Sequence, residues 1–166
     1  MGEPSRPHRV NVRAMIARPA GPDDAAELVR LRPVMLSSIH PVDGNDDWRE
    51  PSRRRLVERL GSPTLAAFVV DRPGGPGLAA CAVGVIEERL GNPSNPSGRS
   101  GYVFSVATDP DMRRRGYARA CMTGLLDWFR EQGVRKVDLR ASAEGEPLYR
   151  SLGFVRTPDP AMRLAL

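Results

Sequence analysis

The sequence predicts a mixed α/β (α+β) fold with helices packed on one central sheet, and three observations lead to this prediction. Apolar residues recur with a period of two in some segments and with helical spacing in others. The predicted order is strand, two helices, three strands, helix, strand, helix and terminal strands, which is typical of a sheet covered by helices. No internal repeat divides the 166 residues, so we expect a disordered leader at 1–9 and a single domain at 10–166.

The first part of the chain is predicted to form one strand and two helices. Residues Val10–Arg18 alternate between apolar and polar side chains, as a half-buried strand does. Asp23 or Asp24 can cap a following helix, which Pro33 is expected to bend or end early. A second, short helix is predicted over Pro51–Leu60. The apolar positions of the first helix keep helical spacing: Ala25, Leu28, Leu31 and Met35.

Three apolar strands are predicted in the middle of the chain. Thr64–Val70 and Leu78–Glu87 are separated by the Pro- and Gly-rich segment 72–77, a strong turn signal, so we expect them to form a hairpin. After another irregular loop at 91–98, the strand Gly101–Thr108 follows.

The last part of the chain alternates between helices and strands. The longest helix is predicted over Arg115–Gln132, because one face of this segment is apolar. A strand over Lys136–Ala141 and a short helix over Pro147–Leu152 follow. Two terminal strands are expected over Phe154–Arg156 and Met162–Ala165.

Composition excludes some classes of function. The net charge is +5 and the pI is about 10, but the basic residues are spread along the chain among 20 acidic ones, so we expect no nucleic-acid partner. No apolar run approaches the roughly 20 residues that cross a bilayer, and the N-terminus has no apolar signal core. We therefore expect a cytoplasmic protein without a membrane partner.

Metal and redox chemistry have little support in the sequence. Cys81 and Cys121 stand alone in apolar surroundings, and we interpret them as small buried hydrophobic residues. His8 and His40 are the two histidines, one in the leader and one in a predicted loop. We therefore expect no metal site.

The most informative segment runs from Val106 to Ala118, from an apolar strand into the longest helix. The free amides of a helix's first turn carry the positive end of its dipole and suit an anion. Gly116 and Ala118 let a ligand approach the backbone, and the arginines 113–115 add charge-assisted donors. The segment is therefore a candidate pyrophosphate site. Neither the GxxxxGK[ST] pattern of a P-loop nor the GxGxxG pattern of a dinucleotide fold is present.

Two motifs resemble those of the GNAT N-acetyltransferases. The first is Arg113-x-x-Gly116-x-Ala118 after a strand and Asp109-Pro110, and the second is Tyr149-x-x-x-Gly153-Phe154. The resemblance implies a mixed, mostly antiparallel sheet of six to seven strands with about four helices, splayed between the fourth and fifth strands. It also implies acetyl-CoA as co-substrate and leaves a homodimer open.

The resemblance further implies roles for individual residues. The backbone of Val106 and Thr108 would bind the pantetheine arm, the Val106 amide would stabilise the oxyanion, and Tyr149 would protonate the departing thiolate. Ser142 stands where many members carry Asn, and Gly145 where many carry Ala. The residues expected to contact the cofactor are Val106, Ala107, Thr108, Arg113, Arg114, Arg115, Gly116, Tyr117, Ala118, Arg119, Ser142 and Tyr149.

The acceptor amine must lose a proton before it attacks, so a base is expected. Glu87 and Glu88, at the end of a predicted strand, are the candidates. Acidic residues of the loop before the second helix could instead attract a cationic amine. That loop holds His40, Asp43, Asp46 and Asp47.

The leading functional hypothesis is acetylation of a primary amine of a small molecule. Acetylation of protein N-termini or lysines is the second hypothesis, and a non-catalytic acyl-CoA sensor is the third. A small nucleic-acid binder is disfavoured because aromatic residues make up only 5% of the chain. No pattern in the sequence identifies the acceptor.

Overall fold

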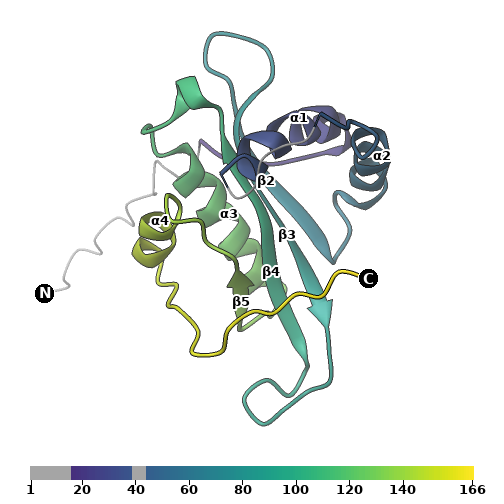
Figure 1. The fold of residues 1–166 in the computed structure, drawn as a ribbon, viewed down its shortest axis with the longest axis vertical. Coiled ribbons are helices and arrows are strands. Elements are labelled where there is room, and N and C mark those ends of the chain that lie inside the picture. Colours follow the sequence, from purple (N-terminus) through teal and green to yellow (C-terminus); the bar gives the residue numbers. More distant parts are fainter. Residues whose placement is uncertain (1–15, 39–43) are drawn as a thin grey trace, which may run out of the picture.

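The computed structural model describes residues 16–38 and 44–166, and within them it has one sheet of five strands in the order β1-β2-β3-β4-β5 (Figure 1). Neighbouring strands are antiparallel except for β4 and β5, which are parallel. The elements are β1 (Arg18–Pro19), α1 (Ala25–Leu36), α2 (Arg49–Arg59), β2 (Leu65–Asp71), β3 (Leu78–Glu88), β4 (Arg99–Thr108), α3 (Tyr117–Glu131), β5 (Val137–Leu139) and α4 (Glu146–Ser151).

The predicted fold class is confirmed, with two corrections to the strands. The expected strands Phe154–Arg156 and Met162–Ala165 are wrong, because that part of the chain has no regular secondary structure. Pro158 and Pro160 lie between them, and a proline has no N–H to donate to a strand ladder. The described sheet therefore has five strands instead of six to seven. The leader 1–9 and most of the predicted strand Val10–Arg18 lie outside the described residues.

Both early helices accommodate a proline. In α1, Pro33 lies in the last turn, and the helix continues to Leu36, so the expected early end is wrong. A proline there removes one hydrogen bond, to the carbonyl of Val29, and the turn continues because Ser37 N donates to Pro33 O. In α2, Pro51 stands in the first turn, where an N–H has no partner within the helix.

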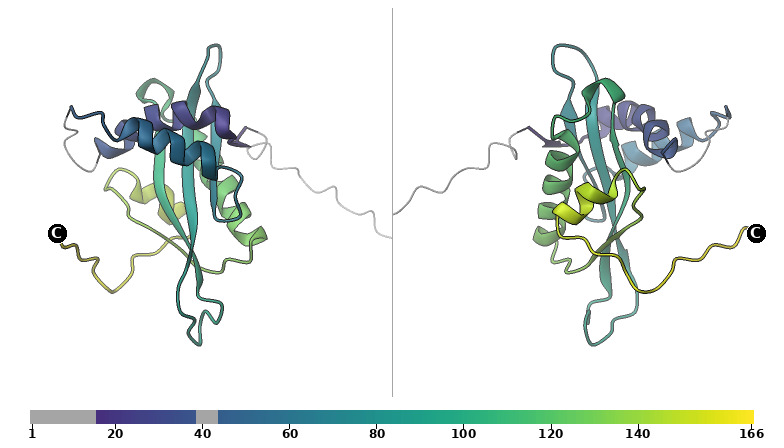
Figure 2. Two further views of the ribbon diagram at one scale, coloured as in Figure 1. Left: turned by 90° about the vertical axis from the view of Figure 1, so that its right-hand side faces the viewer. Right: turned by 60° about the vertical axis from the view of Figure 1, so that its left-hand side comes forward.

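Helices cover the sheet on both sides. Helix α3 packs on one face and α1 on the other, with α2 beside α1 (Figures 1 and 2). Successive side chains of β3 point to opposite faces of the sheet, so both faces are apolar and can hold a helix. Ala80 and Ala82 pack in the cluster that contains α3, while Cys81 and Val83 pack in the cluster that contains α1. Both cysteines are buried, and burial raises the pKa of Cys81 to about 12, so both serve as packing residues.

The fourth and fifth strands pair over a short length only. Strand β5 pairs with Gly101, Tyr102 and Val103 of β4 and then stops, while β4 continues to Thr108. A β-bulge interrupts the β3–β4 register at Phe104, between the pairs Gly84↔Val103 and Val83↔Ser105. The two strands therefore diverge after Val103, as expected. None of the described helices has the length and apolarity that a membrane crossing requires.

Phe129 of α3 packs onto the sheet where two adjacent strands carry glycine. A Cβ at Gly101 would lie 2.8 Å from the Phe129 ring, and a Cβ at Gly84 would also lie 2.8 Å from it. The ring is almost fully buried. The absence of side chains at these two positions allows α3 to lie close to β3 and β4.

We expect Gly101→Ala to lower the free energy of unfolding by about 1–3 kcal/mol, because the new methyl group would overpack the core against Phe129. Chemical denaturation monitored by circular dichroism measures the change. Gly75→Ala in the β2–β3 turn is the control, since a Cβ there meets only an ordinary contact at 3.7 Å. Equal stability of the two variants would contradict this packing.

Candidate active site

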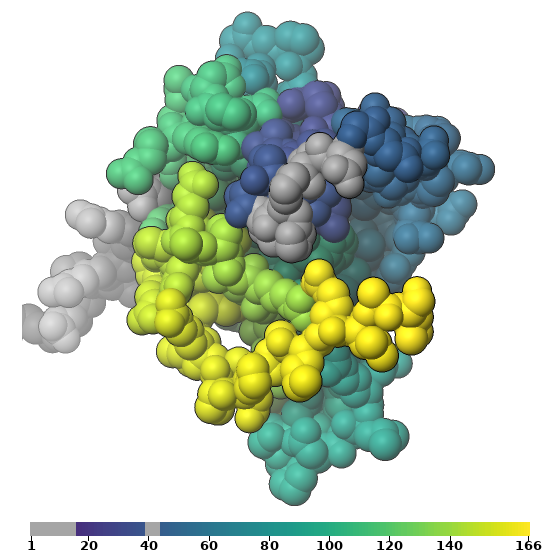
Figure 3. All heavy atoms as spheres, in the orientation of Figure 1, coloured from purple at the N-terminus to yellow at the C-terminus, as the bar shows by residue number. Residues whose placement is uncertain are grey.

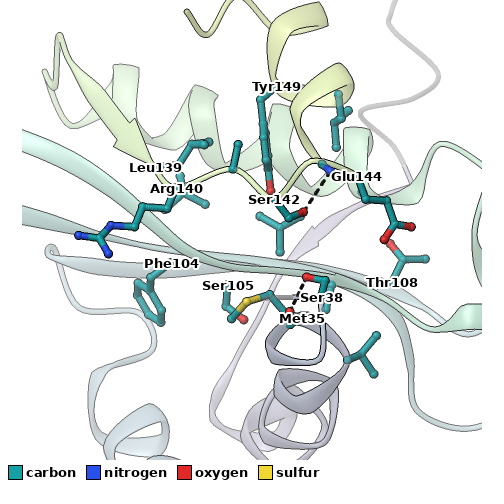
Figure 4. Close-up of a pocket in the computed structure, with 18 of the residues that line it drawn as sticks. Met35, Ser38, Phe104, Ser105, Thr108, Leu139, Arg140, Ser142, Glu144 and Tyr149 are labelled. Carbon is teal, nitrogen blue, oxygen red and sulfur yellow. Dashed lines mark hydrogen bonds between the residues drawn. The ribbon is translucent and has the colours of Figure 1, made fainter. Parts of the chain in front are cut away.

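A pocket of about 1280 Å³ opens where β4 and β5 diverge (Figure 4). Its lining comes from α1, β4, the start of α3, the loop from β5 to α4, and α4 itself. The C-terminal segment crosses the same face of the molecule (Figure 3), and Met162 contributes to the lining. The pocket thus collects residues that lie far apart in the sequence.

The hydrogen-bonding phase of β4 directs backbone groups into this pocket. Asp109 N donates to Ala79 O over 2.9 Å, so in this antiparallel ladder every second residue back from Asp109 bonds to β3. The N–H and C=O of Ala107 therefore point to β3, whereas those of Val106 and Thr108 point to the opposite side. Strand β5 ends before it reaches Val106 and Thr108, so their backbone groups face the pocket.

The start of α3 presents a second set of donors. Gly116 is the N-cap residue with φ 79°, and Arg114 also has a positive φ, 64°. The first intrahelical bond runs from Ala120 N to Gly116 O, so the amides of the three residues before Ala120 have no acceptor within the helix. No acidic residue occupies the first turn and no side chain caps it. These amides and the helix dipole can therefore bind an anion.

The arginines around this helix start differ in their contacts. Arg113 lies 3.5 Å from the carboxylate of Glu144 across the pocket mouth. Arg119 donates to Ser151 Oγ over 2.7 Å and ties α3 to α4. Arg115 donates to Asp111 O over 3.4 Å. Among the described residues, Arg114 has no carboxylate partner, so its cation is available to an anion at the helix start.

Tyr149 extends from α4 with its hydroxyl toward β4 (Figure 4). Its ring packs edge-on against Phe154, with ring centroids 6.0 Å apart, and burial raises the pKa of its phenol. A Cβ at Gly145 would lie 3.0 Å from this ring, so the small residue there makes room for Tyr149. Ser142 Oγ accepts from Gly145 N over 3.1 Å and orders the turn before α4. The phenol is thus held protonated in the pocket.

A buried carboxylate holds the loop between β4 and α3. Asp109, whose side chain is 6% exposed, accepts from both terminal nitrogens of Arg30 at 3.0 Å and from Arg72 at 3.0 Å. Arg72 also binds Asp111 at 2.7 Å, and Arg30 binds Leu78 O at 2.9 Å. This network links α1, the β2–β3 hairpin and the loop that leads to the helix start.

The structure brings together most of the residues expected at the site. Only Arg115, Glu87 and Glu88 of that set do not line the pocket. Glu87 and Glu88 lie at the far end of β3, where they pair with Arg89 and Arg99. The lining includes Val106, Ala107, Thr108, Arg113, Arg114, Gly116, Tyr117, Ala118, Arg119, Ser142 and Tyr149.

The acidic loop is described only in part. His40 and Asp43 lie outside the described residues. Asp46 and Asp47 do not line the pocket, and Asp46 pairs with Arg49 at 2.6 Å. The described part of this loop therefore places no acid in the pocket.

Sequence reasoning missed several residues of the pocket. Arg32 and Met35 come from α1, Phe104 from the bulge of β4, and Arg140 from the position just after β5. Arg32 and Met35 have the spacing of any amphipathic helix, and no short motif marks the other two. Within residues 16–38 and 44–166, no three histidine, cysteine or acidic side chains are grouped as a metal site would require.

Comparison with known proteins identifies the family. The model of the acetyltransferase (GNAT) family matches residues 34–154, well over half of the chain. The chain belongs to the GNAT acetyltransferase family. Members of this family are acyltransferases that use acetyl-CoA as co-substrate.

Solved structures share the fold across nearly the whole chain. A GCN5-related N-acetyltransferase from Ralstonia eutropha JMP134 is 26% identical with a TM-score of 0.76, and the match covers 89% of this chain and 97% of that one. A predicted acetyltransferase from Clostridium acetobutylicum, solved with acetyl-CoA, is 24% identical with a TM-score of 0.77, covering 89% and 94%.

A curated relative matches over a shorter stretch. The [ribosomal protein bS18]-alanine N-acetyltransferase of Escherichia coli K12 is 42% identical over 55 residues. The match covers 31% of this chain and 37% of the relative, so this chain aligns with little more than a third of that protein.

We expect Asp109→Asn to lower the free energy of unfolding by about 2–3 kcal/mol, because the amide removes the charge that two guanidinium groups bind. Denaturant titration measures the loss, and Asp23→Asn, at an exposed acid of the same charge, is the control. A loss no larger than that of the control would show that the network does not hold the loop.

Proposed function

We propose that the protein transfers an acetyl group from acetyl-CoA to a primary amine of a small molecule, by direct attack of the amine on the thioester. The observation that carries this proposal is the position of two groups in one pocket. The Val106 amide faces the gap between β4 and β5, and the Tyr149 hydroxyl extends toward β4 from α4. Acyl transfer needs both an oxyanion donor and an acid for the leaving group.

The residues present fit coenzyme A in two places. The free amides at the start of α3, with Arg113 and Arg114 beside them, suit a pyrophosphate. The backbone groups of Val106 and Thr108 suit the amides of an extended pantetheine arm, which they would bind as a neighbouring strand does. Bound acetyl-CoA supplies the activated thioester, and the protein supplies the groups around it.

Oxyanion stabilisation and protonation of the leaving thiolate each have a residue of the pocket. Val106 N–H donates to the thioester oxygen as the amine nitrogen forms its bond to the carbonyl carbon and negative charge develops on that oxygen. When the carbon–sulfur bond breaks, the Tyr149 hydroxyl gives its proton to the sulfur. The raised pKa of Tyr149 keeps this proton in place at neutral pH, and solvent restores it afterwards.

No carboxylate of the described pocket is placed to take the proton from the acceptor amine. Glu144 is the one carboxylate among the described lining residues, and it pairs with Arg113 at the cofactor end. Glu87 and Glu88 stay predictions as bases, and their place outside the pocket favours loss of the proton to water.

One observation favours a second candidate acceptor. The partial match to the ribosomal-protein alanine N-acetyltransferase supports a protein N-terminus beginning with alanine. An acceptor panel of small amines and an alanine-terminated peptide, assayed by release of free thiol from acetyl-CoA, separates the two. Binding of acetyl-CoA without thiol release from any amine would favour a sensor over an enzyme.

We expect Tyr149→Phe to lower kcat by about 10²-fold or more, because the leaving thiolate loses its proton donor. The dissociation constant of acetyl-CoA should change by less than about twofold, since the ring and its packing on Gly145 remain. Steady-state kinetics and calorimetry measure the two constants. Unchanged kcat would show that another group protonates the thiolate.

We expect acetyl-CoA at millimolar concentration to raise the Tm of the protein, and Gly116→Ala to reduce this shift. Alanine at φ 79° costs roughly 1–2 kcal/mol, which would distort the helix start, although the added Cβ meets no atom. Gly75→Ala is the control, and differential scanning fluorimetry is the measurement. A full shift in Gly116→Ala would contradict a pyrophosphate site at this helix.

A further inference from the structure

Arg32 lies at the end of the pocket away from the pyrophosphate site. It projects from α1, where its Nη1 donates to Phe104 O over 3.0 Å, and its guanidinium carbon stands 5.6 Å from the centre of the Phe104 ring. Phe104 is the bulge residue of β4, and two strand residues span roughly 7 Å. The guanidinium therefore contacts β4 two residues before Val106, whose backbone faces the pocket.

The charge of Arg32 has no described counter-ion. Burial lowers the pKa of Arg32, and within the described residues no carboxylate lies within ion-pair distance of it. Arg30, on the same helix, binds both Glu27 and Asp109. A partly buried cation without an anion is unfavourable, and one of the five N–H donors of Arg32 is bonded to a described residue. The remaining donors form a fork that suits a planar or tetrahedral anion.

A second cation lies across the gap. Arg140 follows β5, lines the pocket and extends toward the same end of it as Phe104 (Figure 4). It too has no ion pair with a described residue. The one described carboxylate of the lining, Glu144, lies at the other end of the pocket with Arg113. The acceptor end of the described pocket is therefore positively charged.

We propose that the acceptor is a small amine carrying a carboxylate or a phosphate within a few bonds of its nucleophilic nitrogen, and that Arg32 binds this anion. This inference rests on the proposed acetyltransferase function and names the substrate class of that site. Arg140 adds to the attraction from the other strand. A polycationic amine is disfavoured, because the same two charges would repel it. A peptide N-terminus is also disfavoured, because it would place a neutral amide beside these arginines instead of an anion.

The test compares acceptors that differ only in the anion. The pairs are β-alanine with β-alaninamide and phosphoethanolamine with ethanolamine, and spermidine and an amidated peptide that begins with alanine complete the panel. Thiol release at saturating acetyl-CoA gives kcat/KM for each, expressed per unprotonated amine so that the differing amine pKa values do not enter. The two pairs distinguish a carboxylate from a phosphate.

For the unsubstituted protein we expect kcat/KM at least about tenfold higher for the anionic member of one pair. Arg32→Gln should lower that value about 10–100-fold, the usual effect of a lost hydrogen bond to a charged group, and leave the neutral member within about twofold. Arg55→Gln, at an exposed arginine of α2 outside the pocket, is the matched control for net charge. It should change kcat/KM for neither the anionic nor the neutral acceptor.

Two further measurements guard against a folding defect. The Tm and the acetyl-CoA affinity of Arg32→Gln should match those of the unsubstituted protein, and Arg140→Gln, in a different element, should lower the anionic preference independently. Equal or faster turnover of the neutral amines, spermidine or the peptide would overturn the inference and leave the acetyltransferase function standing. So would an anionic preference that Arg32→Gln does not alter. Absence of thiol release from every amine would instead overturn the proposed function.

Discussion

The unequal length of two neighbouring strands is the constraint on which the site depends. Strand β4 spans Arg99–Thr108, but β5 pairs with only three of its residues. Backbone donors and acceptors that lack a partner in a sheet are costly when buried and available when a ligand can reach them. Because β5 stops at Leu139, the amides of Val106 and Thr108 are directed into a pocket instead of a ladder.

Two devices keep this open edge in place. At one end the bulge at Phe104 lets β4 bend away from β5. At the other end Asp109 binds Arg30 and Arg72 and so anchors the turn that leads into α3. Arg32 of α1 contacts β4 itself, and Arg30 of the same helix contacts the residue that follows β4.

The charges of the pocket divide it into two ends. The start of α3 and the arginines beside it form one positive end, where the amides of the first turn add to the side-chain charges. Arg32 and Arg140 form the other, and the half-buried phenol of Tyr149 lies in the pocket with them. An acyl donor with a phosphate group and an acceptor with its own anion would then meet where Val106 faces the gap.

The sequence by itself determined the class of the fold, most of the elements and the helix start that faces the pocket. These follow from local causes: the spacing of apolar residues, the turn-forming glycines and prolines, and the small residues and arginines before α3. The terminal strands were predicted wrongly for a related reason. Their apolar residues are a local signal, whereas a strand also needs hydrogen bonds to a neighbouring strand, and residues 154–166 belong to no strand of the described sheet.

Only the tertiary structure decided where β5 ends, which way the backbone of Val106 points, and which side chains complete the pocket. Arg30 and Asp109 are far apart in the chain, and so are Arg32 and Phe104, so no spacing within one segment predicts their contacts. The same reason explains Glu87 and Glu88, whose position at a strand end was correct but whose end of the hairpin lies away from the pocket. A site whose residues lie in one contiguous segment can be recognised from the sequence, whereas a site assembled from several elements depends on how those elements pack.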